Sequence, residues 1–306
     1  MGWTIDDMPD QQGRVALVTG ANSGLGLETT RALISRGCTV LMACRSPRKG
    51  EAARTQLLGA GAAGLDLLEL DLSDLTSVAR CAREVAERYG RLDLLINNAG
   101  LMAPPRILSR QGHELQFAVN HLGHFALTKA LLPLMTNRPQ ARVVTVTSGA
   151  QYFGVMAWDD LQGERRYDRW KAYAQSKLAN VMFALELNQR LQASGHAVRS
   201  LAAHPGLART NLQPVSVAAT GAWQEALAYR LMDPLFQSAA QGALPQLYAA
   251  TASDAQGGAH YGPSQLGGLR GAPKQQPVAR AARDQSQRQR LWTLSESLTE
   301  HQRAEV

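Results

Sequence analysis

The chain has 306 residues, 27 glycines, three cysteines and a formal net charge of +7 at pH 7. This length can bury a sizeable core, and we expect one domain over residues 1–306. Six basic residues and a single acid lie within Ser264–Arg290, which therefore carries +5 of the charge. Because the rest is nearly balanced, composition argues against a strongly basic nucleic-acid-binding body.

The cysteines and the first residues of the chain bear on the cellular compartment in which we expect the protein. Cys38, Cys44 and Cys81 lack the paired spacing of a zinc or redox site, which favours a reducing environment. No apolar run approaches the roughly 20 residues that span a bilayer, and the first residues lack a signal-peptide pattern. Asp6 stands where a myristoylation motif has Ser or Thr. We therefore expect a cytoplasmic protein without a membrane span.

Apolar runs alternate with longer amphipathic stretches through the first 150 residues, as in βαβ units. The expected strands are Arg14–Thr19, Thr39–Cys44, Leu65–Asp71, Leu92–Asn97 and Arg142–Thr147. The expected helices are Leu25–Arg36, Arg48–Leu58, Leu75–Tyr89 and Gly112–Met135. Strands that are apolar on both faces predict a doubly wound parallel α/β sheet, Rossmann-like in form.

The second half continues the pattern and ends less regularly. We expect helices at Tyr167–Ala193 and Ser238–Ala252, and strands at Ala197–His204 and around His260. Gln213–Leu235 is expected to be a substrate-covering lid. Gly, Pro and Gln residues predict an irregular connection over Gly262–Ala279, followed by a helix over Ala281–Leu298.

A glycine-rich segment, T-G-A-N-S-G-L-G at Thr19–Gly26, follows the first strand and opens the first helix. Glycines there let the backbone approach a pyrophosphate at a helix N-terminus. A tight strand-to-helix connection without a ligand would use the same glycines, but the position after the first strand favours the cofactor interpretation.

This pattern resembles the short-chain dehydrogenase/reductase family, and so do N-N-A-G at Asn97–Gly100 and Pro205-Gly206 with Thr210. The resemblance covers Gly13 to Pro263. It implies a cofactor half (about 13–147), a catalytic and substrate half (about 148–263) and a C-terminal extension (about 264–306). It also implies cofactor contacts from Gly20, Asn22, Ser23, Gly24, Leu25, Gly26, Asp71, Leu72, Asn98, Ala99, Gly100, Tyr173, Lys177, Pro205, Gly206 and Thr210.

The end of the second strand indicates which cofactor is used. Arg45 follows that strand where an acid would accept hydrogen bonds from a ribose 2′-hydroxyl, and an arginine can pair with a 2′-phosphate. We therefore predict NADP(H). Arg45 could instead be a solvated surface residue, with Arg48 or Lys49 doing the same work. Asp71 resembles the family's adenine-contacting acid, and its alternative role is a helix N-cap.

Tyr173 and Lys177 stand at i and i+4, on one helix face. Reducing a ketone requires a proton donor, and a tyrosine with a pKa near 10 suits neutral pH poorly. A neighbouring ammonium stabilises tyrosinate and lowers that pKa. Y-x-x-x-K is a weak signal alone, because solvated helices often carry such pairs.

Two polar residues complete the expected catalytic set. Ser148 follows the fifth strand at the edge where such sheets bind ligands, and it is preferred over Thr147 as the group that bonds the substrate oxygen. Asn120 lies mid-helix and resembles the family asparagine that kinks this helix and holds a proton-relay water. Either residue could instead be a satisfied polar group in the core.

Three histidines and three tryptophans are interpreted as structural residues. The spacing of His121, His124 and His204 does not suggest a metal site, and hydride transfer needs none. Trp158, Trp170 and Trp223 more often fill core or lid gaps than line a substrate pocket.

The 25 positions from Ser148 to Tyr173 resemble the retinol-dehydrogenase-like branch. The resemblance implies pro-S hydride transfer between NADP(H) and a small-molecule carbonyl or alcohol. A protochlorophyllide-reductase-like or retinal-reducing enzyme is an alternative, although no cysteine follows Cys81. A non-catalytic NADP-sensing or nucleic-acid-binding protein is another, and aromatic interleaving is absent from Leu266–Arg290. No specific nucleic-acid partner is expected, and a homo-oligomer is compatible with the sequence.

Overall fold

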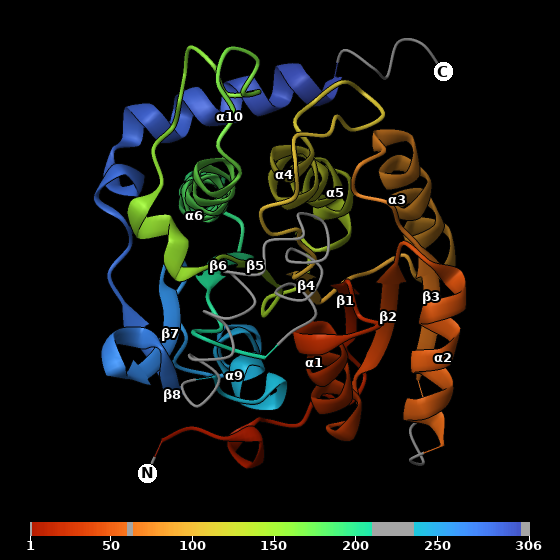
Figure 1. Ribbon diagram of the computed structural model, residues 1–306. Helices are drawn as coiled ribbons and strands as arrows, with labels where there is room; N and C mark the ends of the chain where they lie inside the picture. The colour runs from red at the N-terminus through yellow and green to blue at the C-terminus, as the bar shows by residue number, and fades with distance from the viewer. Residues whose placement is uncertain (1, 60–63, 210–235, 301–306) are drawn as a thin grey trace.

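The fold is built on an eight-stranded sheet in a computed structural model that describes residues 2–59, 64–209 and 236–300 (Figure 1). The strand order is β3-β2-β1-β4-β5-β6-β7-β8, and every neighbouring pair is parallel except β7 with β8. The strands are β1 (Val15–Thr19), β2 (Thr39–Cys44), β3 (Leu65–Glu69), β4 (Leu94–Asn97), β5 (Arg142–Val146), β6 (Arg199–Ala203), β7 (His260–Gln265) and β8 (Arg270–Gln276). β1, β4 and β5 are buried at every position, as expected for strands covered on both faces.

Helices cover both faces, which confirms the predicted doubly wound α/β fold. α1 (Gly24–Ser35), α2 (Pro47–Leu58) and α9 (Ala239–Thr251) contribute to the core on one face. α3 (Leu75–Tyr89), α5 (Gly123–Leu131) and α6 (Arg169–Ala193) pack on the other. Figure 1 shows α10 (Gln285–Glu300) running across the outer side of α5 and α6. Most predicted boundaries lie within two residues of these bounds.

The helix predicted over Gly112–Met135 is interrupted. The chain forms α4 (Leu115–Phe117), a π-helical turn, η2 (Ala118–Leu122), and then α5. In the π-helical turn the Gly123 N–H donates to the Ala118 carbonyl, five residues back. π-turns widen a helix locally and often mark functional sites. Asn120 lies at the centre of this turn.

The irregular connection predicted over Gly262–Ala279 is wrong, because β7 and β8 form an antiparallel pair there. Pro263 and Pro273 face each other in its register. β8 is an edge strand, and Pro263 lies beyond the part of β7 that pairs with β6, so neither proline interrupts a two-sided ladder. Residues typical of turns therefore form β8 at the edge of the sheet, where the sequence pattern predicts no strand.

The predicted final helix starts later than expected. Arg280–Arg283 form a 3-10 turn, and α10 begins at Gln285, where the Asp284 carboxylate accepts the N–H groups of Ser286 and Gln287. Trp292 is buried against Phe183 and Phe125.

Two basic residues of the C-terminal segment help to dock α10. Arg288, whose side chain is 12% exposed, bonds to Gln189 and lies 3.6 Å from the buried Glu186 carboxylate. Arg290 lies over the Trp158 ring at 4.4 Å. The guanidinium groups of Arg288 and Arg290 therefore contact other parts of this chain.

The predicted lid at Gln213–Leu235, with Trp223, and the predicted contact residue Thr210 lie outside the described residues. Across residues 2–59, 64–209 and 236–300, no helix combines the length and the apolar character needed to cross a membrane.

Acid should destabilise this fold through three buried imidazoles. Burial lowers the pKa of His121 to about 3, of His124 to about 4 and of His260 to about 3. The unfolded chain protonates near pH 6.5, so it binds more protons than the folded chain below that pH. Stability is therefore kept above pH 6.5, and between pH 7 and pH 5 each imidazole should remove about 1.5–2 kcal/mol.

Urea unfolding at the two pH values measures this loss. His121→Phe should reduce it, because phenylalanine fits the surrounding aromatic side chains and does not titrate. Equal stability of the wild type at pH 7 and pH 5 would contradict the prediction.

Candidate active site

The predicted site residues gather at the carboxyl edge of the sheet, around the point between β1 and β4 where the strand order reverses. Open α/β sheets bind ligands at this point. A cavity of about 330 Å³ lies there. It is lined by Thr19, Gly20, Asn22, Ser23, Gly24, Leu25, Gly26, Ala43, Arg45, Ser46, Lys49, Leu70, Asp71, Leu72, Asn98, Ala99, Gly100, Leu101 and Val119.

The glycine loop is shaped for close backbone approach. Gly20 has φ +67°, and a Cβ there would lie 3.1 Å from Ala99. A Cβ on Gly26 would lie 2.3 Å from the Gly20 carbonyl oxygen, so only glycine fits. Ser23 precedes α1 and its side chain makes no cap hydrogen bond. The first N–H groups of α1 therefore point to a cavity that can take a phosphate.

One end of the cavity is cationic. Arg45 and Lys49 line it, and neither side chain has a hydrogen-bond or ion-pair partner within the described parts of the chain. Ser46 lines it too and caps α2, accepting the Lys49 N–H at 3.4 Å. Arg48 does not line it. The prediction from the sequence includes Lys49 only as a substitute for Arg45 and does not include Ser46. Both residues lie shortly after β2 in the chain.

Asp71 is not the cap of α3. Asp74 takes that place and accepts the Thr76 N–H at 3.0 Å. The Asp71 carboxylate accepts the N–H and the hydroxyl of Ser73, and the residue lines the cavity. Among the described residues it is the only acid in the lining.

The N-N-A-G segment is tied to β1. The Thr19 hydroxyl oxygen accepts the N–H groups of Asn98 and Ala99, both at 2.9 Å. The Asn98 amide donates to the Thr19 carbonyl at 2.8 Å and accepts from Gln246 of α9 at 3.2 Å. These bonds fix the floor of the cavity relative to the glycine loop.

Lys177 and Asn120 converge on Gly100, which lines the cavity, although the lining itself includes neither of these two residues. A Cβ on Gly100 would lie 3.1 Å from Asn120 Oδ1 and 3.3 Å from Lys177 Nζ. The Lys177 ammonium lies 5.8 Å from the centre of the Tyr173 ring and donates to the Val146 carbonyl at 3.4 Å. Burial lowers its pKa to about 8, and no carboxylate pairs with it among the described residues.

The Asn120 side chain is held in place by three hydrogen bonds. It accepts the Leu101 N–H at 2.8 Å, and its amide donates to the Leu101 carbonyl and to the Ser176 hydroxyl. The residue is fully buried.

The hydroxyls of Thr147 and Ser148 make different hydrogen bonds. Thr147 is buried and donates to the Lys177 carbonyl at 2.7 Å, which fixes α6 against β5. Ser148 is half-buried, accepts the Ala150 N–H at 3.2 Å, and its hydroxyl proton has no acceptor among the described residues. Of the two hydroxyls, that of Ser148 is therefore the one with a proton left to donate within the described structure.

The loop after β6 is held by the strand that the sequence missed. His204 Nδ1 accepts the Gly206 N–H at 3.2 Å, so His204 Nε2 donates to Gln276 of β8 at 2.8 Å. The Leu207 N–H donates to the Leu269 carbonyl at 2.8 Å. Pro205 and Gly206 are thus positioned by the C-terminal extension.

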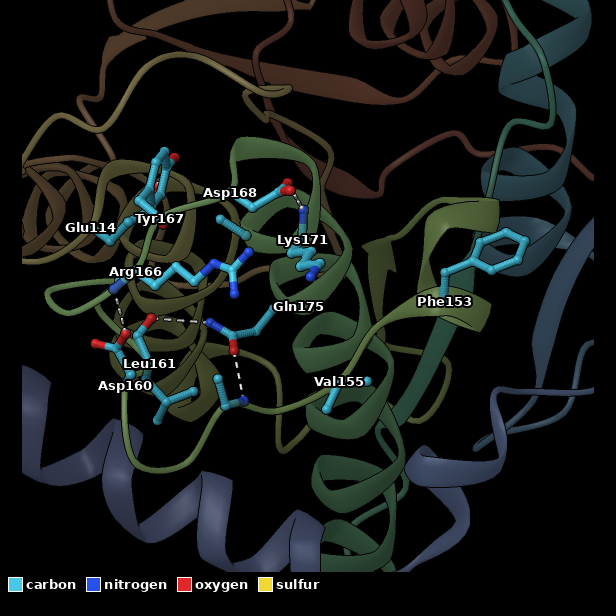
Figure 2. A pocket seen from close by; sticks show the side chains of 13 residues that line it. Glu114, Phe153, Val155, Asp160, Leu161, Arg166, Tyr167, Asp168, Lys171 and Gln175 are labelled. Carbon is cyan, nitrogen blue, oxygen red and sulfur yellow. Dashed lines mark hydrogen bonds between the residues drawn. The ribbon is translucent and has the colours of Figure 1, made fainter.

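A second hollow of about 410 Å³ lies between α6 and the segment that precedes it (Figure 2). Gln175 joins the two by bonding the Leu161 carbonyl and the Ala157 N–H. Asp168, Lys171 and Gln175 line this hollow from the face of α6 opposite Tyr173. None of the predicted site residues that the structure describes lines it.

Of the three tryptophans considered for a substrate pocket, Trp158 and Trp170 lie within the described residues. Trp158 packs against the core beside α6, as expected. Trp170 is 38% exposed, and its ring meets the Tyr173 ring edge-on at 6.4 Å.

The chain matches known proteins over nearly its whole length. The family model described as short chain dehydrogenase matches residues 14–220. Retinol dehydrogenase 12 of Mus musculus is 38% identical over 286 residues, which cover 92% of this chain and 85% of the relative. Retinol dehydrogenase 13 of Homo sapiens is 37% identical over 292 residues, which cover 94% and 84%.

Solved structures agree with this likeness. An uncharacterized protein from Mycobacterium paratuberculosis is 42% identical, with a TM-score of 0.80 over 98% of both chains. A protein from Beutenbergia cavernae, described as an NAD(P)-dependent gluconate 5-dehydrogenase with bound NADP, is 26% identical, with a TM-score of 0.62 over 80% of this chain and 91% of its own. The chain therefore belongs to the short-chain dehydrogenase/reductase family of oxidoreductases, on the branch of the retinol dehydrogenases.

Proposed function

We propose that the protein is an NADP(H)-dependent oxidoreductase that moves hydride between the nicotinamide and a carbonyl or alcohol substrate. The observation that carries the proposal is the convergence of Lys177 and Asn120 on Gly100, a residue of the cavity lining, with the Tyr173 ring beside the Lys177 ammonium. The residues fit a dinucleotide, because the glycine loop permits close approach and the cavity has a cationic end.

The bound nicotinamide would supply or accept the hydride. Tyr173 gives its phenolic proton to the oxygen of the carbonyl being reduced, and the Ser148 hydroxyl donates a second hydrogen bond to that oxygen. The Lys177 ammonium stabilises the tyrosinate that remains and bonds the ribose. Asn120 holds a water that returns a proton towards Lys177. In alcohol oxidation each proton moves in the opposite direction.

Preference for NADPH is supported by Arg45, Ser46 and Lys49. Arg45 and Lys49 make one end of the cavity cationic, Ser46 adds a hydroxyl, and no acid follows β2 in the described turn where one would accept bonds from a 2′-hydroxyl and repel a 2′-phosphate. The Asp71 carboxylate already accepts the N–H and the hydroxyl of Ser73.

Arg45→Asp should lower the NADPH over NADH preference by roughly 10-fold or more, since a charge-assisted contact contributes about 1.5–3 kcal/mol. The measurement is kcat/KM with each cofactor. Arg48→Asp is the matched control, because Arg48 carries the same charge nearby and does not line the cavity. Wild-type enzyme that prefers NADH, or equal shifts in the two variants, would contradict the role of Arg45.

The substrate is sought by following NADPH consumption with aldehydes, aryl ketones, diketones, quinones and retinal. Retinal belongs in this panel because the curated relatives are named retinol dehydrogenases. Consumption with one class supports the proposal, and tight NADPH binding without turnover on any class would favour the non-catalytic cofactor-sensing alternative.

The organisation predicted from the sequence is part of this proposal. It comprises one domain, with a cofactor half at about residues 13–147, a catalytic half at about 148–263 and an extension at about 264–306. Limited proteolysis that released a stable half would overturn it. The cytoplasmic location is also a proposal, tested by fractionating cells that express the full chain.

A further inference from the structure

His124 is a buried residue to which the proposed mechanism gives no part. It is the second residue of α5, directly after the π-helical turn that carries Asn120, and it is 1% exposed. A histidine so deeply buried must have its ring nitrogens satisfied or its burial becomes costly. Its two partners belong to the two halves of the candidate site.

The ring joins Thr19 to Asn120. His124 Nδ1 lies 3.1 Å from the Asn120 carbonyl oxygen, and Nε2 lies 2.9 Å from the Thr19 hydroxyl oxygen. A carbonyl only accepts hydrogen bonds, so Nδ1 carries the proton. Burial, with a smaller effect from the Lys177 charge, lowers the pKa of His124 to about 4, so the ring is neutral at pH 7.

This tautomer settles the hydrogen bonds of Thr19. The neutral ring leaves Nε2 as an acceptor, and the Thr19 hydroxyl donates to it. The alternative acceptor for that proton, the Ile96 carbonyl, lies farther away at 3.4 Å. The Thr19 oxygen remains free to accept the N–H groups of Asn98 and Ala99. One continuous chain of bonds therefore runs from the cavity floor through Thr19 and His124 to the Asn120 backbone.

The place of this chain in the fold gives it a consequence. A π-helical turn departs from the regular pattern of backbone hydrogen bonds, so its geometry depends on added contacts. The imidazole is such a contact for the Asn120 carbonyl. At its other end it holds the hydroxyl that organises the Asn98-Ala99 loop.

We propose that His124 is a positioning residue that couples the Asn120 turn to the cofactor cavity through Thr19. The proposal rests on the proposed function for the effect on turnover, whereas its effects on ring tautomer and NADPH affinity do not. His124 contacts neither substrate nor reacting atoms. It sets where Asn120 and the cavity floor lie relative to each other.

The first test is the tautomer, measured in the full-length wild-type protein by long-range 15N–1H NMR on labelled histidine, with His124→Gln identifying its signal. We expect the Nδ1–H form at pH 7. In Thr19→Val, which replaces the hydroxyl with a methyl group, the Nε2 resonance should move, because that nitrogen loses its donor. An Nε2–H tautomer, a charged ring, or an unmoved Nε2 resonance would overturn the proposal.

The second test removes the two hydrogen bonds of His124, to Thr19 and to the Asn120 carbonyl, one at a time. An asparagine reaches about as far as Nδ1 and can donate to the Asn120 carbonyl, whereas a glutamine reaches about as far as Nε2 and can accept from Thr19. His124→Asn should therefore keep kcat and weaken NADPH binding by roughly 10-fold, and His124→Gln should do the reverse, each change matching about one lost hydrogen bond.

His121→Gln is the matched control. His121 is equally buried, one turn earlier, and it bonds to Ser295 of α10. This variant should keep both kcat and NADPH affinity, and thermal melting checks that all variants are folded. Equal losses in His124→Asn and His124→Gln, or the same losses in His121→Gln, would mean that His124 only packs. Absence of wild-type turnover on every carbonyl overturns the proposed function, while tautomer and NADPH affinity still decide the coupling.

Discussion

Replacing Tyr173 with phenylalanine should lower kcat by about 100-fold or more, which corresponds to about 2.7 kcal/mol of transition-state stabilisation. The substitution removes the phenolic proton donor and keeps the ring, with its edge contact to Trp170 and its place near the Lys177 ammonium. NADPH affinity should change by less than about threefold, because the ring still packs in the same place.

Tyr152→Phe is the matched control for this variant. Tyr152 lies closer to Ser148 in the chain than Tyr173 does, but its hydroxyl donates to the Pro277 carbonyl. Its loss should leave turnover unchanged. If Tyr173→Phe turned over the best substrate as fast as wild type, another group would have to supply the proton.

Replacing Lys177 with methionine should damage both turnover and cofactor binding. The side chain keeps most of its volume but loses the buried charge that stabilises tyrosinate and the donor that bonds the ribose. We expect kcat to fall by about 100-fold and NADPH affinity by about 10-fold. Lys129→Met is the control, since that lysine pairs with Glu296 and Glu300 of α10, away from the cavity. A Lys177→Met variant with wild-type NADPH affinity would contradict the ribose contact.

The same lysine predicts a pH dependence. Burial lowers the pKa of Lys177 to about 8, so in the free enzyme the ammonium is present below that pH and is lost above it. kcat/KM for reduction, which reports on groups of the free enzyme, should therefore fall as pH rises through about 8. A profile that stayed flat from pH 7 to pH 9.5 would show that the charge is not needed.

Local pattern was enough to predict most of the sheet and the framework of the site. Strands buried on both faces are apolar throughout, and glycines are required wherever the backbone passes close to a neighbour, as at Gly20 and Gly26. Tyr173 and Lys177 stand at i and i+4, and helix geometry alone places two such residues on the same face. These features depend on residues near one another in the sequence.

The parts that could not be predicted depend on distant contacts or on weak local signals. The family resemblance implies a kink at Asn120, but the local sequence marks the π-helical turn only by a residue that is a poor helix former. β8 forms from residues typical of turns, because pairing with β7 at an edge tolerates Gly271 and Pro273. His124 looked ordinary because its partner Thr19 lies 105 positions away in the chain.

The central claim is direct hydride transfer from the nicotinamide to a carbonyl carbon, and NADPH carrying deuterium at the pro-S position of C4 tests it most directly. The account predicts that mass spectrometry of the product alcohol finds one deuterium on the former carbonyl carbon. Tyr173→Phe should form the same labelled product at least about 100-fold more slowly. Product without deuterium, or label delivered only from the pro-R position, would contradict the account.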